Sequence, residues 1–405
     1  MRVETTTCCV VGGGPAGMMA GLLLARAGVD VTVLEKHEDF FRDFRGDTIH
    51  PATLRILAEL DIAEDFLARP HTRMPRVSMQ TASGPLTIAE FTRLQPYGFI
   101  AFVPQWDFLD FLYDRAKSYP TFDLLRRAEV TDLVLDSGRV AGVRAQTADG
   151  PMEVRADLVL AADGRDSVIR ERAGLEVIPK SPPIDVLWFR LPRTTDEVVP
   201  FFRSEGDSVL VSIDRGTYWQ LAYVIPHRGF DRVQERGLPT FRAAVAALAP
   251  TFADRLEEVT DWQQVKLLSV RVDRLRRWYR PGLLCIGDAA HAMSPAGGVG
   301  INLAVQDAVA AANVLGPALR TGGPTTGDLR AVQRRRELAT RVTQAFQIRV
   351  VGNLYPRPGS ASAERPDPLP IRVIRRLPAL RHLTGRFIGM GLQPEHVRTT
   401  AATPG

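Results

Sequence analysis

The sequence predicts an α/β fold in which a Rossmann-like dinucleotide-binding domain is interleaved with an antiparallel β-sheet domain and followed by C-terminal helices. Two glycine-rich turns, one after residue 11 and one after residue 286, each stand between an apolar strand-like run and a helical pattern. Between them, residues 181–272 consist mostly of short β-like runs. At 405 residues, the chain is long enough for two or three domains.

The first glycine-rich turn lies within a strand–turn–helix–strand pattern. Residues 6–11 resemble a buried strand, 18–27 a helix, and 30–34 a second strand that ends at Glu35. Gly12, Gly14 and Gly17 satisfy G-x-G-x-x-G in the context that a dinucleotide site requires. We expect these glycines to form the tight turn, admit a pyrophosphate and let the helix pack on the strand. Glu35 is then placed to accept hydrogen bonds from an adenosine ribose.

The second glycine-rich segment spans residues 284–302. An apolar run ends at Gly287 and Asp288, a turn rich in proline and glycine follows, and a helical pattern begins near Gly300. This order predicts a carboxylate at a strand end and free backbone N–H groups at a helix start, which together favour an anionic group. A reduced flavin, which carries negative charge on its pyrimidine ring, is one such ligand. A further buried strand, residues 156–163, ends at Asp163-Gly164.

The remaining elements follow from periodicity and turn residues. We expect a helix near 52–59, a hairpin over 76–91 that turns at Ser83-Gly84-Pro85, an amphipathic helix over 105–117 and a hairpin over 130–145. Strands are expected over 185–191, 208–213, 218–225 and 265–272, with a helix near 240–248, and the 76–91 hairpin should add to their sheet. Residues 352–370 read as a linker, 371–387 as a helix, and the tail beyond Pro394 as frayed.

We therefore predict a discontinuous domain organisation. Residues 1–75, 92–180 and 273–345 would form the cofactor-binding domain, and 76–91 with 181–272 the substrate-binding β-sheet domain. Residues 346–405 would form a linker and a C-terminal helical segment.

Composition limits the class of protein. Hydrophobic residues make up 45% and charged residues 24% of the chain, as in ordinary soluble proteins. We expect no membrane span, no signal peptide and a cytoplasmic location. Cys8, Cys9 and Cys285 fall in expected buried strands with no metal-ligand spacing, so we expect reduced thiols and no metal. Only four of the 51 basic residues are lysines, and the arginines are scattered over many expected elements. Despite the net charge of +5, we therefore expect no nucleic-acid partner.

Together, the three motifs resemble the single-component (class A) FAD-dependent monooxygenases of the para-hydroxybenzoate hydroxylase type, the family of aromatic and polyketide hydroxylases. The resemblance spans about residues 6–350. It rests on the glycine fingerprint, Asp163-Gly164, and the run from Gly287-Asp288 through Pro295 to Gly298-x-Gly300-x-Asn302. It implies FAD as cofactor, with NADPH or NADH as a transient co-substrate and O₂ as oxidant. It also implies hydroxylation of an aromatic or polycyclic small molecule through a flavin C4a-hydroperoxide, in a monomer or homodimer of secondary metabolism. Epoxidation and Baeyer–Villiger insertion stay open, because the same peroxide can carry out each.

The resemblance also implies site residues. The residues expected to bind the cofactor are Gly12, Gly14, Ala16, Gly17, Glu35, Lys36, Arg45, Gln105, Asp163, Gly164, Gly287, Asp288, Pro295, Gly297, Gly298, Gly300, Ile301 and Asn302. The expected substrate pocket comprises Trp188, Phe201, Phe202, Trp219 and Tyr223 with Pro295. His50, Tyr97, Tyr223 and His227 are candidate bases, but none is singled out, so the catalytic residue is unknown.

Two alternatives remain open on the same motifs. One is an FAD-linked reductase or dehydrogenase, such as a reductase of isoprenoid double bonds. The other is a non-catalytic flavin-binding redox sensor.

Overall fold

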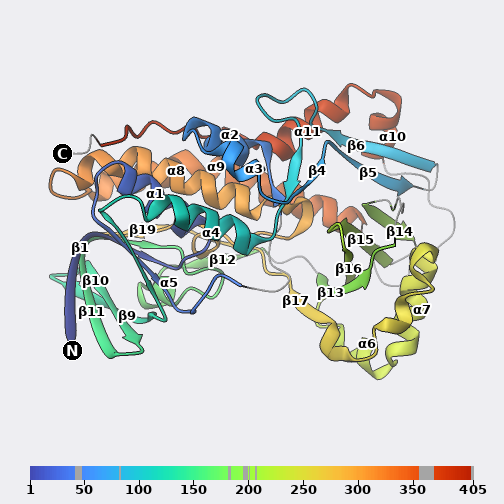
Figure 1. The fold of residues 1–405 in the computed structure, drawn as a ribbon, viewed down its shortest axis with the longest axis horizontal. Helices are drawn as coiled ribbons and strands as arrows, with labels where there is room; N and C mark the ends of the chain where they lie inside the picture. The colour runs from blue at the N-terminus through green and yellow to red at the C-terminus, as the bar shows by residue number, and fades with distance from the viewer. Residues whose placement is uncertain are drawn as a thin grey trace.

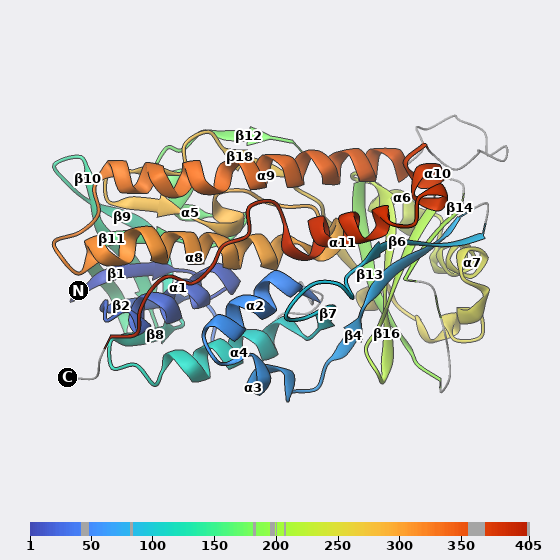
Figure 2. The ribbon, with the colours of Figure 1, turned by 90° about the horizontal axis from the view of Figure 1, so that it is seen from above.

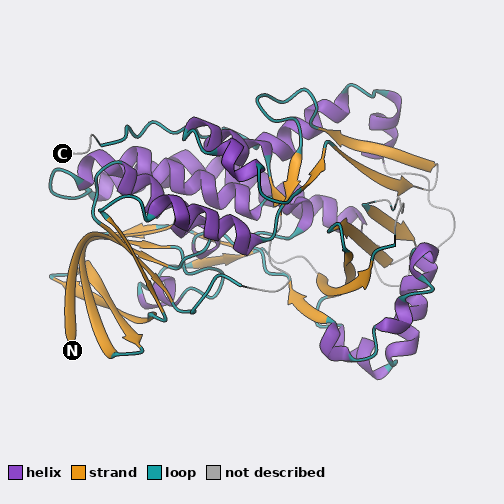
Figure 3. Ribbon diagram, viewed as in Figure 1, coloured by secondary structure: helices purple, strands orange, loops and turns teal. Residues whose placement is uncertain are grey.

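Two large β-sheets lie at opposite ends of the molecule, and long helices run between them (Figure 1, Figure 2). The structure is a computed structural model that describes residues 1–41, 48–81, 84–180, 184–194, 199, 201–205, 208–354 and 369–402. Figure 3 shows that helices predominate between the sheets and strands at the two ends.

The first sheet has eight strands in the order β19-β20-β11-β1-β2-β8, with β10 beside β11 and β9 beside β10. Its strands are β1 (Arg2–Val11), β2 (Val31–Glu35), β8 (Phe122–Arg126), β9 (Glu129–Asp136), β10 (Arg139–Thr147), β11 (Gly150–Ala161), β19 (Tyr279–Arg280) and β20 (Leu283–Cys285). The central pairs are parallel, and Val11 lies beside both Leu34 and Ala161, while Ala161 lies beside Cys285. The carboxyl ends of four strands therefore meet at one edge, where ligands bind in open α/β sheets.

Helices cover this sheet and extend away from it (Figure 2). The helices are α1 (Pro15–Arg26), α2 (Pro51–Glu59), α3 (Ala63–Leu67), α4 (Gln105–Ala116), α5 (Val168–Arg172), α6 (Phe230–Glu235), α7 (Leu238–Leu248), α8 (Gly300–Leu319), α9 (Thr326–Leu354), α10 (Leu369–Arg376) and α11 (Leu380–Met390). Helix α1 begins with Pro15, whose missing N–H costs nothing at a helix start, and it packs against α8 and α4. Ten of its twelve residues are buried, so it is a core helix rather than an amphipathic surface helix.

The second sheet has seven strands in the order β17-β13-β16-β15-β14-β5-β6. They are β5 (Arg76–Thr81), β6 (Gly84–Glu90), β13 (Ile184–Pro192), β14 (Phe202–Glu205), β15 (Ser208–Asp214), β16 (Tyr218–Pro226) and β17 (Lys266–Ser269). The expectation that the 76–91 hairpin joins this sheet is confirmed, although Ser83 of its expected turn lies outside the described residues. The sheet is not wholly antiparallel, because β14 and β5 pair in parallel. These two strands come from distant segments, so no tight turn forces them to run in opposite directions.

Smaller elements complete the fold. A three-stranded sheet has the order β3 (Thr48–Ile49), β7 (Ile100–Phe102), β4 (Thr72–Met74), and β12 (Val177–Pro179) pairs with β18 (Asp273–Leu275). Short 3₁₀ helices span Pro250–Phe252, Leu256–Glu258, Trp262–Gln264, Gly287–Ala289 and Ala296–Gly298.

The C-terminal part differs from the sequence expectation. Helix α9 continues to Leu354, so a domain boundary at residue 346 and a linker from residue 352 both fall inside a helix. Residues 355–368 of the expected linker lie outside the described residues, and α10 begins at Leu369.

Residues 395–402, the described part of the tail beyond Pro394, are not frayed, so that prediction is wrong for them. The Glu395 side chain is buried and forms ion pairs with Arg335 and Arg336 of α9, at 2.7 and 3.4 Å. The tail then runs back along the helices toward the first sheet (Figure 2), where Ala402 N donates to Arg26 O at 2.8 Å. Contacts with residues distant in sequence hold the tail, and its local sequence carries no sign of them.

One apolar segment, Ala296–Leu319, is long enough by composition to cross a membrane. Within that segment, 78% of the apolar window is buried in the protein, because α8 packs against α1 and α9. It is a core helix. The three cysteines are also buried, and burial raises the pKa of the Cys9 thiol to about 12.

Candidate cofactor and substrate site

The N-terminal glycines close a tight turn between β1 and α1. Gly12 has a φ of +102°, and a Cβ there would lie 2.5 Å from Ala162 O, so only glycine fits. A Cβ on Gly17 would lie 1.9 Å from Gly12 O, so this glycine lets α1 pack on the turn. A Cβ on Gly14 would meet nothing within 4 Å. The space beside Gly14 is open, as the close approach of a ligand requires.

Glu35 stands at the end of β2, buried beside the same turn. Its Oε2 accepts a hydrogen bond from Gly13 N at 2.8 Å, and its Oε1 accepts one from His37 N at 3.0 Å. The carboxylate thus fixes the turn.

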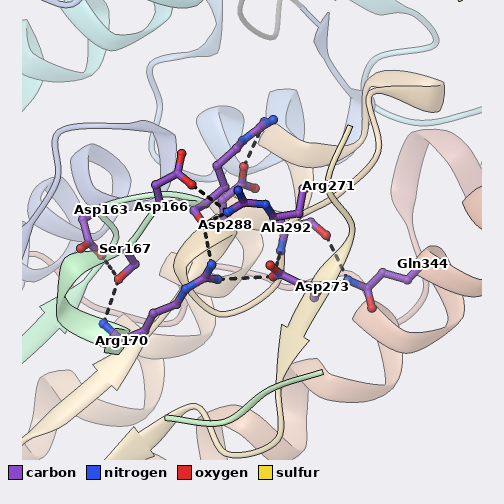
Figure 4. Close-up of polar contacts among 10 residues, drawn as sticks. Asp163, Asp166, Ser167, Arg170, Arg271, Asp273, Asp288, Ala292 and Gln344 are labelled. Carbon is purple, nitrogen blue, oxygen red and sulfur yellow. Dashed lines mark hydrogen bonds and ion pairs between the residues drawn. The ribbon is translucent and has the colours of Figure 1, made fainter. Parts of the chain in front are cut away.

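The hydrogen bonds of the Asp163 side chain are made mainly within the protein, at the start of α5. Asp163 Oδ1 accepts from Ser167 Oγ at 2.6 Å and its Oδ2 accepts from Ile169 N at 3.1 Å, so this carboxylate holds the start of α5. Burial raises the pKa of Asp163, and these hydrogen bonds oppose that shift. Figure 4 shows Asp163 and Ser167 beside Arg170, whose guanidinium forms a buried ion pair with Asp273 at 3.3 Å.

Asp288 lies farther along the same group of polar side chains (Figure 4). Its Oδ2 is 3.5 Å from Arg165 Nη2, and its side chain is partly exposed. The neighbouring Gly287 lies deeper, where its N–H donates to Asp307 Oδ2 at 3.1 Å and a Cβ would come within 3.0 Å of Ala16 Cβ. Gly287 therefore shapes the loop, whereas Asp288 faces the cavity.

The loop from Pro295 to the start of α8 is held from two sides. Gln347 Nε2 donates to Ser294 O and Ala296 O at 2.8 and 2.7 Å. On the other side, Thr48 Oγ1 donates to Gly298 O at 2.8 Å. Gly297 and Gly298 have φ values of +78° and +61°, the left-handed conformation that glycine adopts readily.

Helix α8 begins directly after this loop, with its first residues at the cavity wall. The first turn of a helix leaves backbone N–H groups without intrahelical partners, which favours negative charge in front of it. Asn302, buried in this turn, accepts from Thr53 Oγ1 at 3.1 Å through its Oδ1, and its Nδ2 has no hydrogen-bond partner. A buried donor without a partner suggests that a ligand supplies one.

A single cavity of about 1130 Å³ connects this edge of the first sheet with the second sheet. The expected cofactor residues that line it are Gly12, Gly14, Ala16, Glu35, Lys36, Gln105, Asp163, Gly164, Asp288, Pro295, Gly297, Gly298, Gly300, Ile301 and Asn302. Gly17 and Gly287 do not line it and act through packing, and Arg45 lies outside the described residues.

The expected substrate-pocket aromatic residues divide into three that line the cavity and two that do not. Trp188, Phe201 and Phe202 line the cavity, but Trp219 and Tyr223 do not. These two residues lie on the opposite face of β16, where Trp219 packs on Phe252 and Tyr223 on Phe241. Gln220, Ala222 and Val224 occupy the cavity face of that strand. Both faces of β16 are covered, so aromatic character does not mark the cavity side.

Sequence reasoning missed the helical wall of the cavity. Residues of α9, α10 and α11 line it opposite the second sheet: Thr343, Phe346, Gln347, Ile371, Ile374, Thr384, Phe387 and Ile388. The spacing of Ile371 and Ile374 is a weak helical signal for one apolar face, but it does not indicate what that face covers.

None of the four candidate bases lines the cavity. His50 is fully buried, which lowers its pKa to about 4, and its Nδ1 donates to Ile388 O at 3.0 Å. Tyr97 donates to Glu64 at 2.8 Å, and burial together with this bond raises its pKa to about 12. His227 Nδ1 lies 3.1 Å from Asp185 Oδ1, and the Tyr223 hydroxyl lies 3.1 Å from Ser208 Oγ.

Comparison with known proteins now decides the family. A family model described as an FAD binding domain matches residues 4–346. 6-Methylpretetramide 4-monooxygenase of Streptomyces rimosus is 35% identical over 405 residues, covering 97% of this chain and 94% of the relative. The chain belongs to the FAD-dependent monooxygenases.

Other relatives agree with this assignment. Protoasukamycin 4-monooxygenase of Streptomyces nodosus subsp. asukaensis is 27% identical over 343 residues, covering 79% of this monooxygenase and 81% of the relative. The structure of PqsL of P. aeruginosa in complex with 2-aminobenzoylacetate matches with a TM-score of 0.75 at 20% identity, covering 87% of this chain and 97% of the other. OxyS anhydrotetracycline hydroxylase from Streptomyces rimosus matches with a TM-score of 0.75 at 22% identity, covering 95% of this chain and 76% of the other. At these identities the structural matches show the fold alone. The resemblance inferred from the motifs is confirmed, and the relatives favour the monooxygenase over the reductase and sensor alternatives.

The residues of the cavity fit FAD. The open space beside Gly14 can admit a pyrophosphate, and Glu35 lies within the same wall for a ribose. The start of α8 and the unpartnered Nδ2 of Asn302 suit the electron-rich pyrimidine edge of a flavin.

Proposed function

We propose that this monooxygenase hydroxylates an uncharged, polycyclic aromatic small molecule of secondary metabolism, with NADPH or NADH and O₂ as co-substrates. One observation carries the substrate class. The charged side chains that line the cavity are Glu35, Lys36, His37, Glu129, Asp163, Arg165, Asp166 and Asp288, all on the elements of the first sheet and its loops. Among the described residues, the lining from the second sheet and from α9–α11 carries none.

An apolar wall selects against ionised substrates. Burying an isolated carboxylate without a partner is very costly, whereas burying a planar ring gains about 25 cal/mol per Å² of apolar surface. The wall consists of strand residues such as Ile184, Val186, Val209 and Val211, facing Phe346 and Phe387 on the helices. The relatives named for 6-methylpretetramide and 12-dehydrotetracycline support the same class.

We assign cofactor binding to the three motifs at the edge of the first sheet, and substrate binding to the second sheet with its helical wall. Bound FAD, reduced by NAD(P)H, would supply the electrons that activate O₂ and allow one oxygen atom to enter the ring. The start of α8 and Asn302 would stabilise negative charge on the reduced ring. Gln347 and Thr48 would hold the Pro295 loop in place, and the apolar wall would exclude water.

The composition of the substrate end also indicates whether a side chain can act there as a base. Among the described residues, no histidine, carboxylate, lysine or tyrosine lines the substrate end. We therefore propose that an electron-donating hydroxyl of the substrate activates its own ring, without a side-chain base at that end. We place the enzyme in the cytoplasm as a monomer or homodimer.

The test uses ¹⁸O₂ and the FAD-loaded enzyme with 1-naphthol or a hydroxylated tricyclic aromatic compound as probe. The expected result is substrate-dependent NAD(P)H oxidation and a product that carries one ¹⁸O atom, detected by mass spectrometry. A product with two added hydrogens and no ¹⁸O would overturn the proposal in favour of a reductase.

A further inference from the structure

In the part of the chain that the structure describes, the sheet wall of the substrate cavity is apolar apart from two side chains, Gln220 near one end of β16 and Trp188 of β13, whose indole N–H is buried without a hydrogen-bond partner. Among the described residues of that wall, Gln220 carries the one carboxamide, and its side chain is buried with 3% exposure. The alternation along β16 places Gln220 on the cavity face with Ala222 and Val224. A buried amide in such a wall requires hydrogen-bond partners for both its oxygen and its nitrogen.

The oxygen of this amide has a partner. Arg215 Nε donates to Gln220 Oε1 at 3.0 Å, and the Arg215 guanidinium stacks on Phe102, 5.7 Å from the ring centroid. Because a guanidinium carries donors and no acceptor, the atom that faces Arg215 must be the oxygen. The orientation of the amide is thereby fixed without ambiguity between oxygen and nitrogen.

The amide nitrogen is left for the cavity. The Arg215 contact is the one hydrogen bond that the Gln220 side chain makes within the described part of the chain, and its Nε2 is not among the fully buried atoms without a partner, so it remains accessible from the cavity that Gln220 lines. Arg190 lies opposite Gln220 in the register but is exposed and stacks on Tyr218, so it neither accepts from the amide nor lines the cavity. The hydrogen bond from the charged Arg215 guanidinium to the amide oxygen also polarises the Gln220 amide and strengthens its N–H donors.

We infer that Gln220 is a specificity-determining residue whose Nε2 donates a hydrogen bond to an uncharged acceptor oxygen of the substrate, a ring carbonyl or a phenolic hydroxyl, and that Arg215 is the positioning residue that orients it. This inference rests on the proposed function, because it assigns a contact to the substrate of that site. A hydrocarbon that fills the cavity would exclude water and leave the donor without a partner, which costs binding.

The test compares two planar three-ring probes that differ by one carbonyl, 9-fluorenone and fluorene. Each is titrated into the FAD-loaded protein, and its dissociation constant is measured from the perturbation of the flavin absorbance. The wild type should bind 9-fluorenone about tenfold more tightly than fluorene, as expected for one hydrogen bond to a buried donor.

Three variants separate the donor from a structural role. Gln220→Leu should remove the preference by weakening 9-fluorenone binding and leaving fluorene binding unchanged. Gln220→Glu keeps an acceptor for Arg215 but presents an oxygen to the cavity, so it should bind 9-fluorenone less tightly than fluorene. Tyr223→Phe, which removes a hydroxyl on the opposite face of β16, should keep the wild-type preference. FAD content and thermal midpoint are measured for each variant to confirm folding.

The outcomes are distinct. Equal binding of the two probes to the wild type, or a preference that persists in Gln220→Leu, overturns the role of Gln220 and leaves the proposed function standing. No perturbation by either probe overturns the proposed polycyclic substrate class and this inference with it.

Discussion

At the level of single residues, the glycines of the G-x-G-x-x-G motif have different structural roles although they look equivalent in the sequence. Gly12 and Gly17 are required by the protein itself, because a Cβ at either position would collide with backbone atoms. Gly14 has an extended backbone with φ −76°, and its surroundings are open. The protein itself does not require glycine at residue 14, and the open space there suits the close approach of a ligand.

This difference gives a first prediction. Gly14→Val should fold, with a loss of about 1 kcal/mol for the poorer helix cap, but should lose FAD. Gly17→Val should instead lower the stability of the fold, because its Cβ would lie 1.9 Å from Gly12 O. Thermal unfolding and flavin absorbance of the purified variants check both. Retention of FAD by Gly14→Val would show that the pyrophosphate lies elsewhere.

A second prediction concerns Glu35. Glu35→Ala removes a buried acceptor from the cavity wall and should weaken FAD binding by on the order of 1–3 kcal/mol. Fluorescence titration of the apoprotein with FAD measures this. Glu38→Ala, an exposed carboxylate paired with Arg127, is the matched control and should leave FAD affinity unchanged. Equal affinities in both variants would contradict the assignment.

The third prediction is a pH dependence of stability. Burial lowers the pKa of His50 from 6.5 to about 4, so between these values the unfolded chain binds a proton that the folded chain does not. The contribution of His50 is therefore fully present above pH 6.5 and is lost as the pH falls toward 4. From pH 7.5 to 5 the loss is about 2 kcal/mol.

Urea unfolding at the two pH values checks this. His50→Gln can still donate to Ile388 O. Between the two pH values, its free energy of unfolding should fall by about 2 kcal/mol less than that of the wild type. His71→Gln, a change at a partly exposed ring, should behave like the wild type. If the free energy of unfolding of His50→Gln falls as much between the two pH values as that of the wild type, other groups determine the acid sensitivity.

At the scale of the element, one buried carboxylate joins α8, α9, the Gly287 loop and the tail. Asp307 lies 2.6 Å from His291 Nε2 and 3.0 Å from Arg336 Nε, and it accepts from Gly287 N. Burial alone would raise the pKa of Asp307, but its contacts with His291 and Arg336 outweigh burial and lower it. Arg336 in turn contacts Glu395, so the same network anchors the tail.

A fourth prediction follows. Asp307→Asn removes the carboxylate that contacts both His291 and Arg336, leaves Glu395 as the remaining charged partner of Arg336, and should destabilise the protein by up to about 3–5 kcal/mol. Glu176→Gln, which removes the partner of Arg276 in an exposed pair, should change stability little. Chemical denaturation of both variants makes the comparison. Equal stabilities would show that the network orders the tail without stabilising the fold.

At the scale of the whole molecule, three segments far apart in sequence meet at one sheet edge. Parallel pairing of β1 with β2 and β11, and of β11 with β20, brings their carboxyl ends together. The fifth prediction is that FAD, which we propose spans the edge from Glu35 to the start of α8, stabilises the apoprotein. At 100 times its dissociation constant the gain is about 2.7 kcal/mol.

A thermal shift measurement tests this linkage. FMN lacks the adenosine half and should shift the midpoint less than FAD at the same concentration. Equal shifts would mean that the Gly12–Gly14 turn does not contact the adenosine side of the cofactor.

How far the sequence predicts the molecule depends on the range of the interactions concerned. The glycine turn, the strand before it and the helix after it follow from backbone sterics, so residues within a few positions determine them. The hairpins over 76–91 and 130–145 follow from alternation and turn residues. Trp219 and Tyr223 lie on the face of β16 that packs against α7, not on the cavity face where we expect them from the sequence. Alternation along the strand places both on one face, but it cannot show which face packs against α7.

The family, the cofactor and the elements that carry the motifs can therefore be read from the sequence, since these depend on local spacing. The tertiary structure alone decided which face of β16 meets the cavity, that α9–α11 complete its wall, and that Glu395 anchors the tail. It also paired Arg215 with Gln220 across a turn, beside the cavity that Gln220 lines. These features depend on which surfaces pack together, and packing is set by contacts between segments distant along the chain.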